Sequence, residues 1–418
     1  MQEKIITFAS PVFFLLIAIE FIVARRRQRH LYRINDAINS LSLGVMSQII
    51  GVFLKVLAVG VYTWVVQHYA IFHLSGDDWW VWVSGLLLYD FLYYWLHRMG
   101  HETNLLWAAH VVHHQSEAYN LTTALRQTST GALFGWIFYL PLAVLGYPVH
   151  VFIIVALIDL LYQFWIHTEQ IDKLGWFDRV FVSPSNHRVH HGVNDLYLDK
   201  NYGGILILWD RLFGTFIEEQ DAHPVVFGTR SPLRSWNPLW ANLEVYKAVA
   251  ADAWSTRNWW DKCRIWLMPP GWRPADIAAS EPAKSFDILR PEYNPPLSGT
   301  RMWYCLIQFA VSLQVATHFL TVAPVAHAAQ LVPYAIWLVA GLWIVGGLME
   351  QKRWHTGYIG LEAVRLVATL LMVVVSASWF QLVALPVMAQ MAIATACIAS
   401  LISLGLIFKT AGHGHLSR

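Results

Sequence analysis

HRMGHE (residues 97–102), HVVHH (110–114), QFWIHTE (163–169) and NHRVHH (186–191) mark the stretch that decides how this chain is organised. Residues 97–191 hold ten of the 19 histidines, and nine of the ten belong to these four segments. The tenth, His150, stands alone, and a lone histidine is usually a hydrogen-bonded structural residue; we interpret His318 in the same way. The sequence before the stretch resembles a membrane anchor, and the sequence after it resembles a polar lid followed by more membrane anchor.

The composition predicts a membrane protein. The 418-residue chain is 56% hydrophobic and 13% charged, whereas soluble domains have about 25% charged residues. Its 22 Trp, 17 Tyr and 21 Phe are residue types that line membrane interfaces. The net charge of +2 argues against a nucleic-acid partner. The cysteines are too far apart for a disulfide framework or a cysteine metal site: Cys263, Cys305 and Cys397.

Three apolar runs precede the histidines, at residues 5–24, 41–66 and 79–96. Each is close to the roughly 20 residues that a membrane span needs. Arg25, Arg26 and Arg27 follow the first run, and the positive-inside rule places that end in the cytoplasm. The third run therefore ends on the same side. It carries Asp90, seven residues before His97 and on the same helical face.

The apolar segment 131–166 is interrupted by Pro141, Gly146 and Pro148. Its halves are too short for two full spans, which predicts a helical hairpin that returns to the cytoplasmic side at His167. Residues 168–300 are the least hydrophobic part of the chain. Four more apolar runs follow, at residues 303–322, 330–348, 362–380 and 384–408.

The spacing of the histidines points to metal chemistry. One box has i,i+4 spacing and two have i,i+3,i+4 spacing, so each can point two or three imidazoles at one centre from a helix face. Imidazole suits iron, zinc, copper and nickel. Eight or nine nitrogen ligands are too many for one ion and about right for two. HETNL at 101–105 lacks the second histidine of a zinc-peptidase HExxH motif.

We therefore expect an all-α fold: a polytopic membrane helical bundle with a cytoplasmic histidine-rich di-metal cap and an additional C-terminal transmembrane helix group. As an integral, multi-pass protein it would lie in the inner or plasma membrane of a bacterium, or in the endoplasmic reticulum of a eukaryote. The expected parts are N-terminal transmembrane spans (1–96), a histidine-rich core with the membrane hairpin 131–166 (97–250), a cytoplasmic linker region (251–300) and C-terminal transmembrane helices (301–418).

The motifs HxxxH, HxxHH and HxxHH, in this order and between membrane spans, resemble the fatty acid hydroxylase/sterol desaturase superfamily of membrane di-iron oxygenases. HVVHHQSEAYNLTTALRQT (110–128) and DKNYGGILILWDRLFGTF (199–216) most resemble its glyceryl-ether monooxygenase branch, and the resemblance covers residues 1–245 well. It implies two iron ions per chain, with residues 97–250 as the di-iron hydroxylase core. The implied iron ligands are His97, His101, His110, His113, His114, His187, His190 and His191, with His167 as a further ligand.

The resemblance also assigns roles around the ligands. Glu102 matches the acidic residue after HxxxH, a catalytic-site position that orients a ligand imidazole. Gln163 stands where some members have a further histidine, so that an amide or a water completes the coordination. Further candidates around the ligands are Asn186, Asp159 and Glu169. Candidates for binding a lipid headgroup or a pterin are Asn120, Thr122 and Arg126, for which helix capping and loop support are the alternative.

The implied reaction uses O2 to hydroxylate a C–H bond of a membrane lipid, with cleavage of alkylglycerol ethers to an aldehyde and a glycerol derivative as the leading hypothesis. Tetrahydrobiopterin or another external reductant, supplied by a separate electron donor, would deliver the electrons. The sequence leaves open whether the protein forms a homodimer. The alternatives are a sterol, hopanoid or fatty-acyl hydroxylase or desaturase, and a metal transporter, which would need ionisable residues within several spans.

Overall fold

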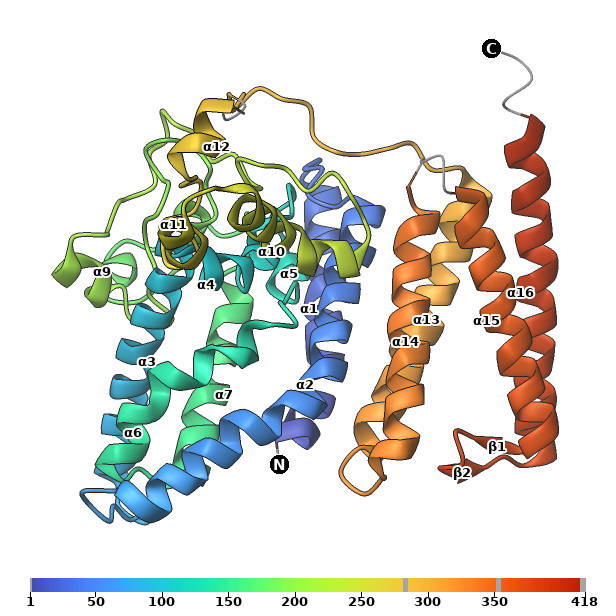
Figure 1. Cartoon of the computed structure of the whole chain (residues 1–418), viewed down its shortest axis with the longest axis horizontal. Coiled ribbons are helices and arrows are strands. Elements are labelled where there is room, and N and C mark those ends of the chain that lie inside the picture. Colours follow the sequence, from blue (N-terminus) through green and yellow to red (C-terminus); the bar gives the residue numbers. More distant parts are fainter. Residues whose placement is uncertain (1, 281–284, 351–354, 414–418) are drawn as a thin grey trace. The chain divides into compact units, whose positions relative to one another are not determined.

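The computed structural model describes residues 2–280, 285–350 and 355–413, and most of them are helical (Figure 1). The predicted all-α membrane architecture is confirmed. Five of the described helices contain segments long and apolar enough to cross a membrane: Ile34–Leu54, Gly299–Val322, Ala328–Leu348, Thr356–Ser376 and Val387–Ile407. The chain is thus a multi-pass integral membrane protein.

The chain divides into two compact units. The first, which we call the histidine unit, comprises Met1–Ser47, Phe53–Arg234 and Trp240–Glu292. The second, the C-terminal unit, comprises Gln48–Val52, Ser235–Leu239 and Tyr293–Arg418. This division is coarser than the four parts expected from the sequence, which stay a prediction.

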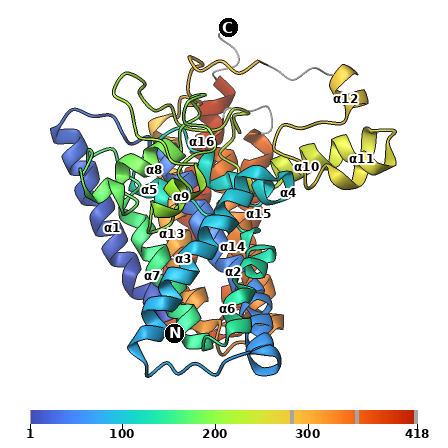
Figure 2. The same cartoon turned by 90° about the vertical axis from the view of Figure 1, so that its left-hand side faces the viewer.

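Several short helices of the histidine unit lie together at the ends of two of its long helices. The short helices α4, α5 and α8 gather at one end of α3 and α7 (Figure 2). The longer helices are α1 (Gln2–Arg26), α2 (Ile34–Tyr69), α3 (Trp79–Glu102), α7 (Val149–Trp165) and α10 (Pro238–Ser255). The shorter α-helices are α4 (Asn104–Ala108), α5 (Leu121–Ala124), α6 (Leu140–Leu145), α8 (Pro184–His190), α9 (Leu208–Phe213), α11 (Trp259–Arg264) and α12 (Ala275–Ser280). The 3₁₀ helices are η1 (Val111–His114), η2 (Gly131–Leu133), η3 (Gly135–Tyr139) and η4 (Phe177–Arg179).

An apolar core holds α2, α3, α6 and α7 together. Tyr89 of α3 stacks on Tyr139 at 4.5 Å, and Tyr62 of α2 stacks on Phe152 of α7 at 4.1 Å. Stacked rings of this kind stabilise a core beyond the burial of their area. The core fixes the direction of α3 and α7, and therefore the place at which each helix delivers its histidines.

The turn between α6 and α7 depends on Gly146. Gly146 has φ +87°, and a Cβ there would lie 1.8 Å from the carbonyl oxygen of Phe72. Only glycine fits such a position. Pro148 precedes the first residue of α7 and favours a helix start. The chain therefore reverses at the break that the sequence predicts.

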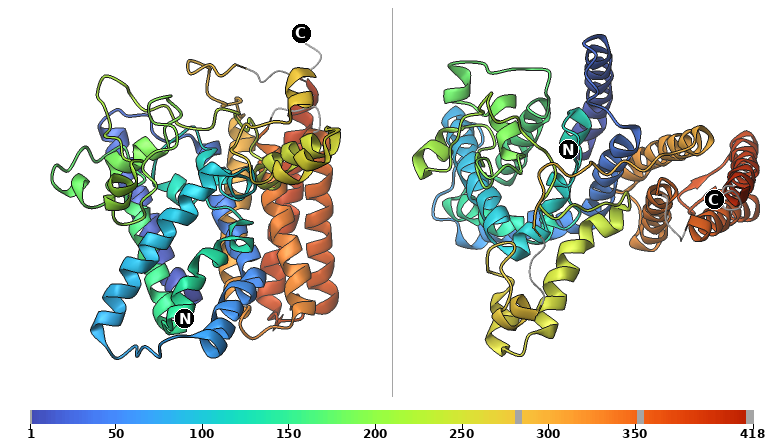
Figure 3. Two further views of the ribbon diagram at one scale, coloured as in Figure 1. Left: turned by 60° about the vertical axis from the view of Figure 1, so that its left-hand side comes forward. Right: turned by 90° about the horizontal axis from the view of Figure 1, so that it is seen from above.

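The C-terminal unit contains α13 (Gly299–Val322), α14 (Ala328–Leu348), α15 (His355–Ser376) and α16 (Val387–His413). Successive helices pack against each other, and α13 also contacts α16, so that the four helices form a bundle (Figure 3). The chain around the gap between the last two apolar runs forms the strands β1 (Ser378–Trp379), at the end of the run expected at 362–380, and β2 (Val383–Ala384), with Trp379 paired to Val383. α16 begins only after Pro386, because a proline disfavours the helical conformation of the residue before it.

Candidate metal centre

Segments far apart in the sequence bring the nine motif histidines to one end of α3 and α7. α3 carries the first box in its last turns, η1 the second and α8 the third, while the lone histidine follows the end of α7. The start of α8 is well defined: Pro184 takes the first position, and the hydroxyl of Ser183 accepts a hydrogen bond from the amide of Asn186. The ends of α3, η1, α7 and α8 thus present the side chains.

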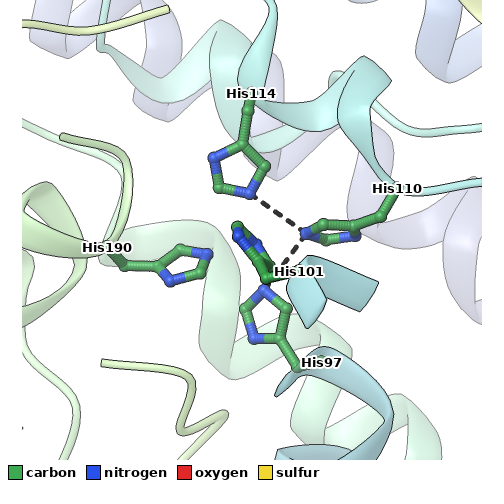
Figure 4. A group of neighbouring side chains, drawn as sticks. All are labelled: His97, His101, His110, His114 and His190. Carbon is green, nitrogen blue, oxygen red and sulfur yellow. Dashed lines mark hydrogen bonds between the residues drawn. The ribbon is translucent and has the colours of Figure 1, made fainter. Parts of the chain in front are cut away.

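The imidazoles form two groups, and within each group one nitrogen from every ring lies within 4.8 Å of the others. Set A, drawn in Figure 4, comprises His97, His101, His110, His114 and His190. Set B comprises His113, His167, His187 and His191. Eight of the nine side chains are buried, and that of His110 is partly buried.

Each HxxHH box contributes to both sets. In both boxes the two histidines four residues apart share a set, and the middle one joins the other set. His113 thereby joins set B, and His190 joins set A. Two of the three imidazoles of each HxxHH box thus share a set, in agreement with the two or three expected, and the middle one points into the other set. Neighbouring positions on a helix differ by about 100°, so the middle histidine of the box points elsewhere.

Backbone carbonyl groups orient four of the rings. In each case Nδ1–H donates to a carbonyl oxygen, which places the proton on Nδ1 and leaves Nε2 with a lone pair. The Nδ1–oxygen distances are 2.8 Å from His97 to Tyr202, 2.9 Å from His190 to Lys200, 2.9 Å from His113 to Arg126 and 2.7 Å from His167 to Gln163.

The arrangement of the free nitrogens calls for a cation. Nε2 of His113 lies 3.1 Å from Nε2 of His167, and neither carries a proton while Nδ1 donates to a carbonyl. Two lone pairs then face each other, which is repulsive unless a cation lies between them. Nε2 of His101 and of His190 is buried without a hydrogen-bond partner among the described residues. Burial also lowers the pKa of His113 to about 4, which keeps this ring neutral. These residues fit metal ions.

A loop between α8 and α9 supplies two of the orienting carbonyl groups. Two buried carboxylates hold this loop. Asp90 of α3 accepts hydrogen bonds from the amides of Ile205 and Leu206 at 2.7 and 3.1 Å. Asp210 accepts those of Tyr202 and Gly203 at 2.7 and 2.8 Å. Asp90, on the face of α3 that carries His97, thus acts on that histidine through the loop.

Glu102 does not contact an imidazole among the described residues. Its carboxylate accepts a hydrogen bond from Nε of Arg98 at 2.8 Å. The carboxylate beside a ring is that of Asp199, whose Oδ1 lies 3.5 Å from Nδ1 of His101. Sequence reasoning missed Asp199, although it lies in the segment DKNYGG, which carries part of the family resemblance.

The side chain of Gln163 is directed away from the histidines by two hydrogen bonds. Its amide donates to Asp159 at 2.7 Å, and its oxygen accepts from the hydroxyl of Tyr93 at 2.8 Å. The backbone carbonyl of Gln163, in contrast, accepts a hydrogen bond from Nδ1 of His167. Asp159 in turn lies beside the loop, because a Cβ at Gly204 would be 2.5 Å from its Oδ1.

Asn186 and Glu169 contact the surrounding loops. The amide of Asn186 donates to the carbonyl oxygens of Asp178 and Phe181 at 3.0 and 3.2 Å. The backbone carbonyl of Glu169 accepts a hydrogen bond from Arg29 at 2.7 Å, and burial raises the pKa of its carboxyl to about 7. Both residues support segments that carry motif histidines.

Asn120, Thr122 and Arg126 are buried and bonded within the protein. Asn120 caps α5, accepting from the amide of Thr122 at 3.0 Å. The guanidinium of Arg126 donates to the carbonyl of Val112 at 2.7 Å and to Asn39 at 2.6 Å. These contacts favour the alternative of helix capping and loop support over contact with a headgroup or pterin.

Comparison with known proteins agrees with the site. The model of the fatty acid hydroxylase family matches residues 82–215, which contain every motif histidine. Alkylglycerol monooxygenases match most of the chain: that of Xenopus tropicalis is 35% identical, covering 82% of this chain and 77% of its own. The human enzyme is 36% identical over the same shares, and that of Danio rerio is 35% identical over 84% of this chain and 78% of its own. No solved structure matches this chain.

Proposed function

Because the chain belongs to the fatty acid hydroxylase family, together with the alkylglycerol monooxygenases, we propose that it is a membrane di-iron monooxygenase that cleaves the ether bond of alkylglycerols. It would use O2 to convert them to an aldehyde and a glycerol derivative. The observation that carries the proposal is the division of nine buried imidazoles into sets A and B. Each set has enough donors for one ion, and imidazole suits iron.

In this proposal the chain positions and tunes the ions. His97, His101, His110, His114 and His190 would hold one iron, and His113, His167, His187 and His191 the other. When bound, the ions supply the activation of O2 that the attack on an unactivated C–H bond requires. The carbonyl groups bonded to Nδ1 raise the basicity of the rings and fix their direction. Burial of the centre excludes water and reduces the loss of the oxidant to side reactions.

We place the centre on the cytoplasmic side of the membrane. The basic residues Arg25 and Arg26 occupy the last turn of α1, and α3 runs to the histidines at its end. The positive-inside rule supports this orientation. A membrane lipid would then reach the centre from the bilayer, and an electron donor from the cytoplasm. Tetrahydrobiopterin is the reductant proposed here, with Asn120, Thr122 and Arg126 now assigned to support of the loop.

The competing hypotheses are less well supported. A sterol, hopanoid or fatty-acyl hydroxylase or desaturase would need the same centre, but the alkylglycerol monooxygenases match the chain over most of its length. A metal transporter would carry ionisable residues in several spans. In the described part of the C-terminal helices, Glu362 and Arg365 form a buried ion pair. Both residues lie on α15, and so on one span rather than several.

Product analysis tests the proposal. Membranes that contain the protein are incubated with an alkylglycerol, tetrahydrobiopterin and isotope-labelled O2, and the aldehyde is trapped by immediate reduction. We expect labelled fatty alcohol and free glycerol from the wild type, and none from His113→Ala. His223→Ala, which changes an exposed histidine, is the matched control and retains activity. Hydroxylated sterol or acyl lipid from native membranes, with the alkylglycerol left intact, would refute the proposed substrate.

A further inference from the structure

The C-terminal unit contains a large cavity that has no part in the proposed chemistry. The cavity has a volume of about 860 Å³ and is lined by all four helices and the β1–β2 hairpin. This volume lies in the range of small-molecule and cofactor sites, which is about 300–1,000 Å³. Most of the lining residues are apolar or aromatic, among them Val311, Val315, Trp337 and Ile393.

A polar network crosses this apolar space. Glu362 of α15, which is 0% exposed, accepts hydrogen bonds from Arg365 at 2.7 Å and from the hydroxyl of Tyr304 at 2.9 Å. Arg365 also donates to Gln308 of α13 at 3.1 Å, and Gln308 donates to Ser400 of α16 at 2.9 Å. Ionisable residues at such a depth in a membrane helix are costly and mark functional sites.

The network is electrically balanced. Arg365 donates to Glu362 through both Nε and Nη2, each at 2.7 Å, so that the two charges cancel. An anionic ligand would have to compete with Glu362 for the guanidinium. The amide of Gln308 and the hydroxyl groups of Tyr304 and Ser400 instead match a neutral head that both donates and accepts hydrogen bonds.

The cavity is long as well as large. On α13 its lining extends from Thr300 to His318, which is about 27 Å of helix at 1.5 Å per residue. The hydrogen-bonding groups Tyr304 and Gln308 lie in the first half of this length. Beyond them the wall is mainly apolar up to His318, which bonds to the hydroxyl of Tyr334 at 3.0 Å and so is a satisfied structural histidine, as expected. Such a site suits a polar head with one extended hydrocarbon tail.

We propose that the four-helix C-terminal unit binds a neutral single-chain lipid with a hydroxyl-bearing head, its head at Gln308, Arg365 and Ser400 and its tail along α13 toward the β1–β2 hairpin. Several lining residues of α13 are also exposed, including Trp303 at 59% and Ile307 at 56%. The ligand can therefore enter sideways from an apolar environment. The proposal is independent of the chemistry at the histidines, because it concerns binding within the second unit alone.

Photolabelling of the full-length protein in phospholipid nanodiscs tests this proposal. The probe is an alkylglycerol with a diazirine in its chain, and the labelled residues are mapped by mass spectrometry. We expect adducts on cavity-lining residues of α13–α16. Excess unlabelled alkylglycerol or monoacylglycerol should abolish them, whereas a fatty acid of equal chain length should not. Labels at the histidine unit are counted separately, so that binding there does not affect the result.

Two substitutions on one helix separate head recognition from general packing. Gln308→Leu removes a hydrogen-bonding partner and should reduce labelling of the cavity about five- to tenfold. Gln314→Leu makes the same change at another lining residue, which is exposed, and should leave labelling unchanged. Val315→Trp fills the tail region and should block labelling even if Gln308→Leu proves unstable. Thermal unfolding of each variant identifies any loss of the fold.

Three results would overturn the proposal. The first is equal competition by the fatty acid, which would show that the site does not select a neutral head. The second is labelling spread evenly over the outward faces of the four helices, which would mean that bilayer lipid alone surrounds them. The third is equal labelling of Gln308→Leu, Gln314→Leu and Val315→Trp, which would show that the label lies outside the cavity.

Discussion

Opposed lone pairs characterise the centre at the scale of single residues. His113 and His167 each donate a hydrogen bond from Nδ1–H to a backbone carbonyl oxygen, and their Nε2 atoms lie 3.1 Å apart. The residue types and their spacing predicted a metal site, and the ring directions agree with it. What spacing could not predict was the exchange of His113 and His190 between the sets, since it depends on where the other helices end.

The side chains that lie beside the rings were harder to predict than the grouping of the histidines. Glu102, next to His101 in the sequence, bonds to Arg98, while Asp199 lies beside the ring of His101. Adjacent residues on a helix point in directions about 100° apart. The side chain of Glu102 therefore does not lie beside the ring of its neighbour His101.

Iron content should follow the two sets. We expect about two iron ions per wild-type chain, and about one in His113→Ala, because set B is reduced from four donors to three. His101→Ala should also lower the content, through set A. Elemental analysis of purified protein gives the ratio, and His150→Ala, an exposed histidine outside both sets, should match the wild type. One iron in the wild type, or unchanged iron in His113→Ala, would contradict the assignment.

At the scale of secondary structure, the loop between α8 and α9 is as important as the helices. Its carbonyl groups orient His97 and His190, Asp90 holds it against α3, and Asp210 of α9 accepts hydrogen bonds from its amides. Helices were predictable here because apolar periodicity and length mark them. The shape of the loop was not, because it depends on hydrogen bonds to buried carboxylates, and one of these, Asp90, belongs to a distant helix.

Gly204→Ala should displace this loop. The added Cβ would lie 2.5 Å from Oδ1 of Asp159 and 3.0 Å from Oδ1 of Asp90. We expect a loss of stability of about 1–3 kcal/mol, typical of overpacking, together with reduced iron content. Thermal unfolding and metal analysis measure both. Gly51→Ala is the control, because its Cβ meets nothing within 4 Å. Equal stability and iron content of the two variants would show that the loop accommodates the added Cβ without affecting the metal centre.

At the scale of the whole molecule, the chain combines two units with separate cores. One contains the histidines, and the other a helical bundle with its own polar network and cavity. Hydropathy indicated the helices of both units. It did not indicate the cavity, because a row of apolar residues does not reveal how closely two helices approach.

Removal of metal should affect one unit only. After chelation, the lone pairs within sets A and B repel one another, because no cation lies between them. Loss of a bound ion also lowers the stability of the folded protein that binds it. We expect faster amide hydrogen exchange in η1 and α8, with α13–α16 unchanged. Mass spectrometry at peptide resolution measures this, and re-addition of ferrous iron should restore protection. Equal loss of protection in both units would contradict the prediction that metal stabilises the histidine unit alone.

The sequence by itself determined the membrane class, the helical architecture, the nine histidines and the family. These properties depend on composition, helical periodicity and spacing, which are local to the chain. The tertiary structure decided how the histidines divide into two sets, which carbonyl groups and carboxylates orient them, and that the C-terminal helices line a large, mainly apolar cavity. Several of these features depend on contacts between residues far apart in the sequence, such as His97 with Tyr202 and His101 with Asp199, and the spacing of a motif does not contain them.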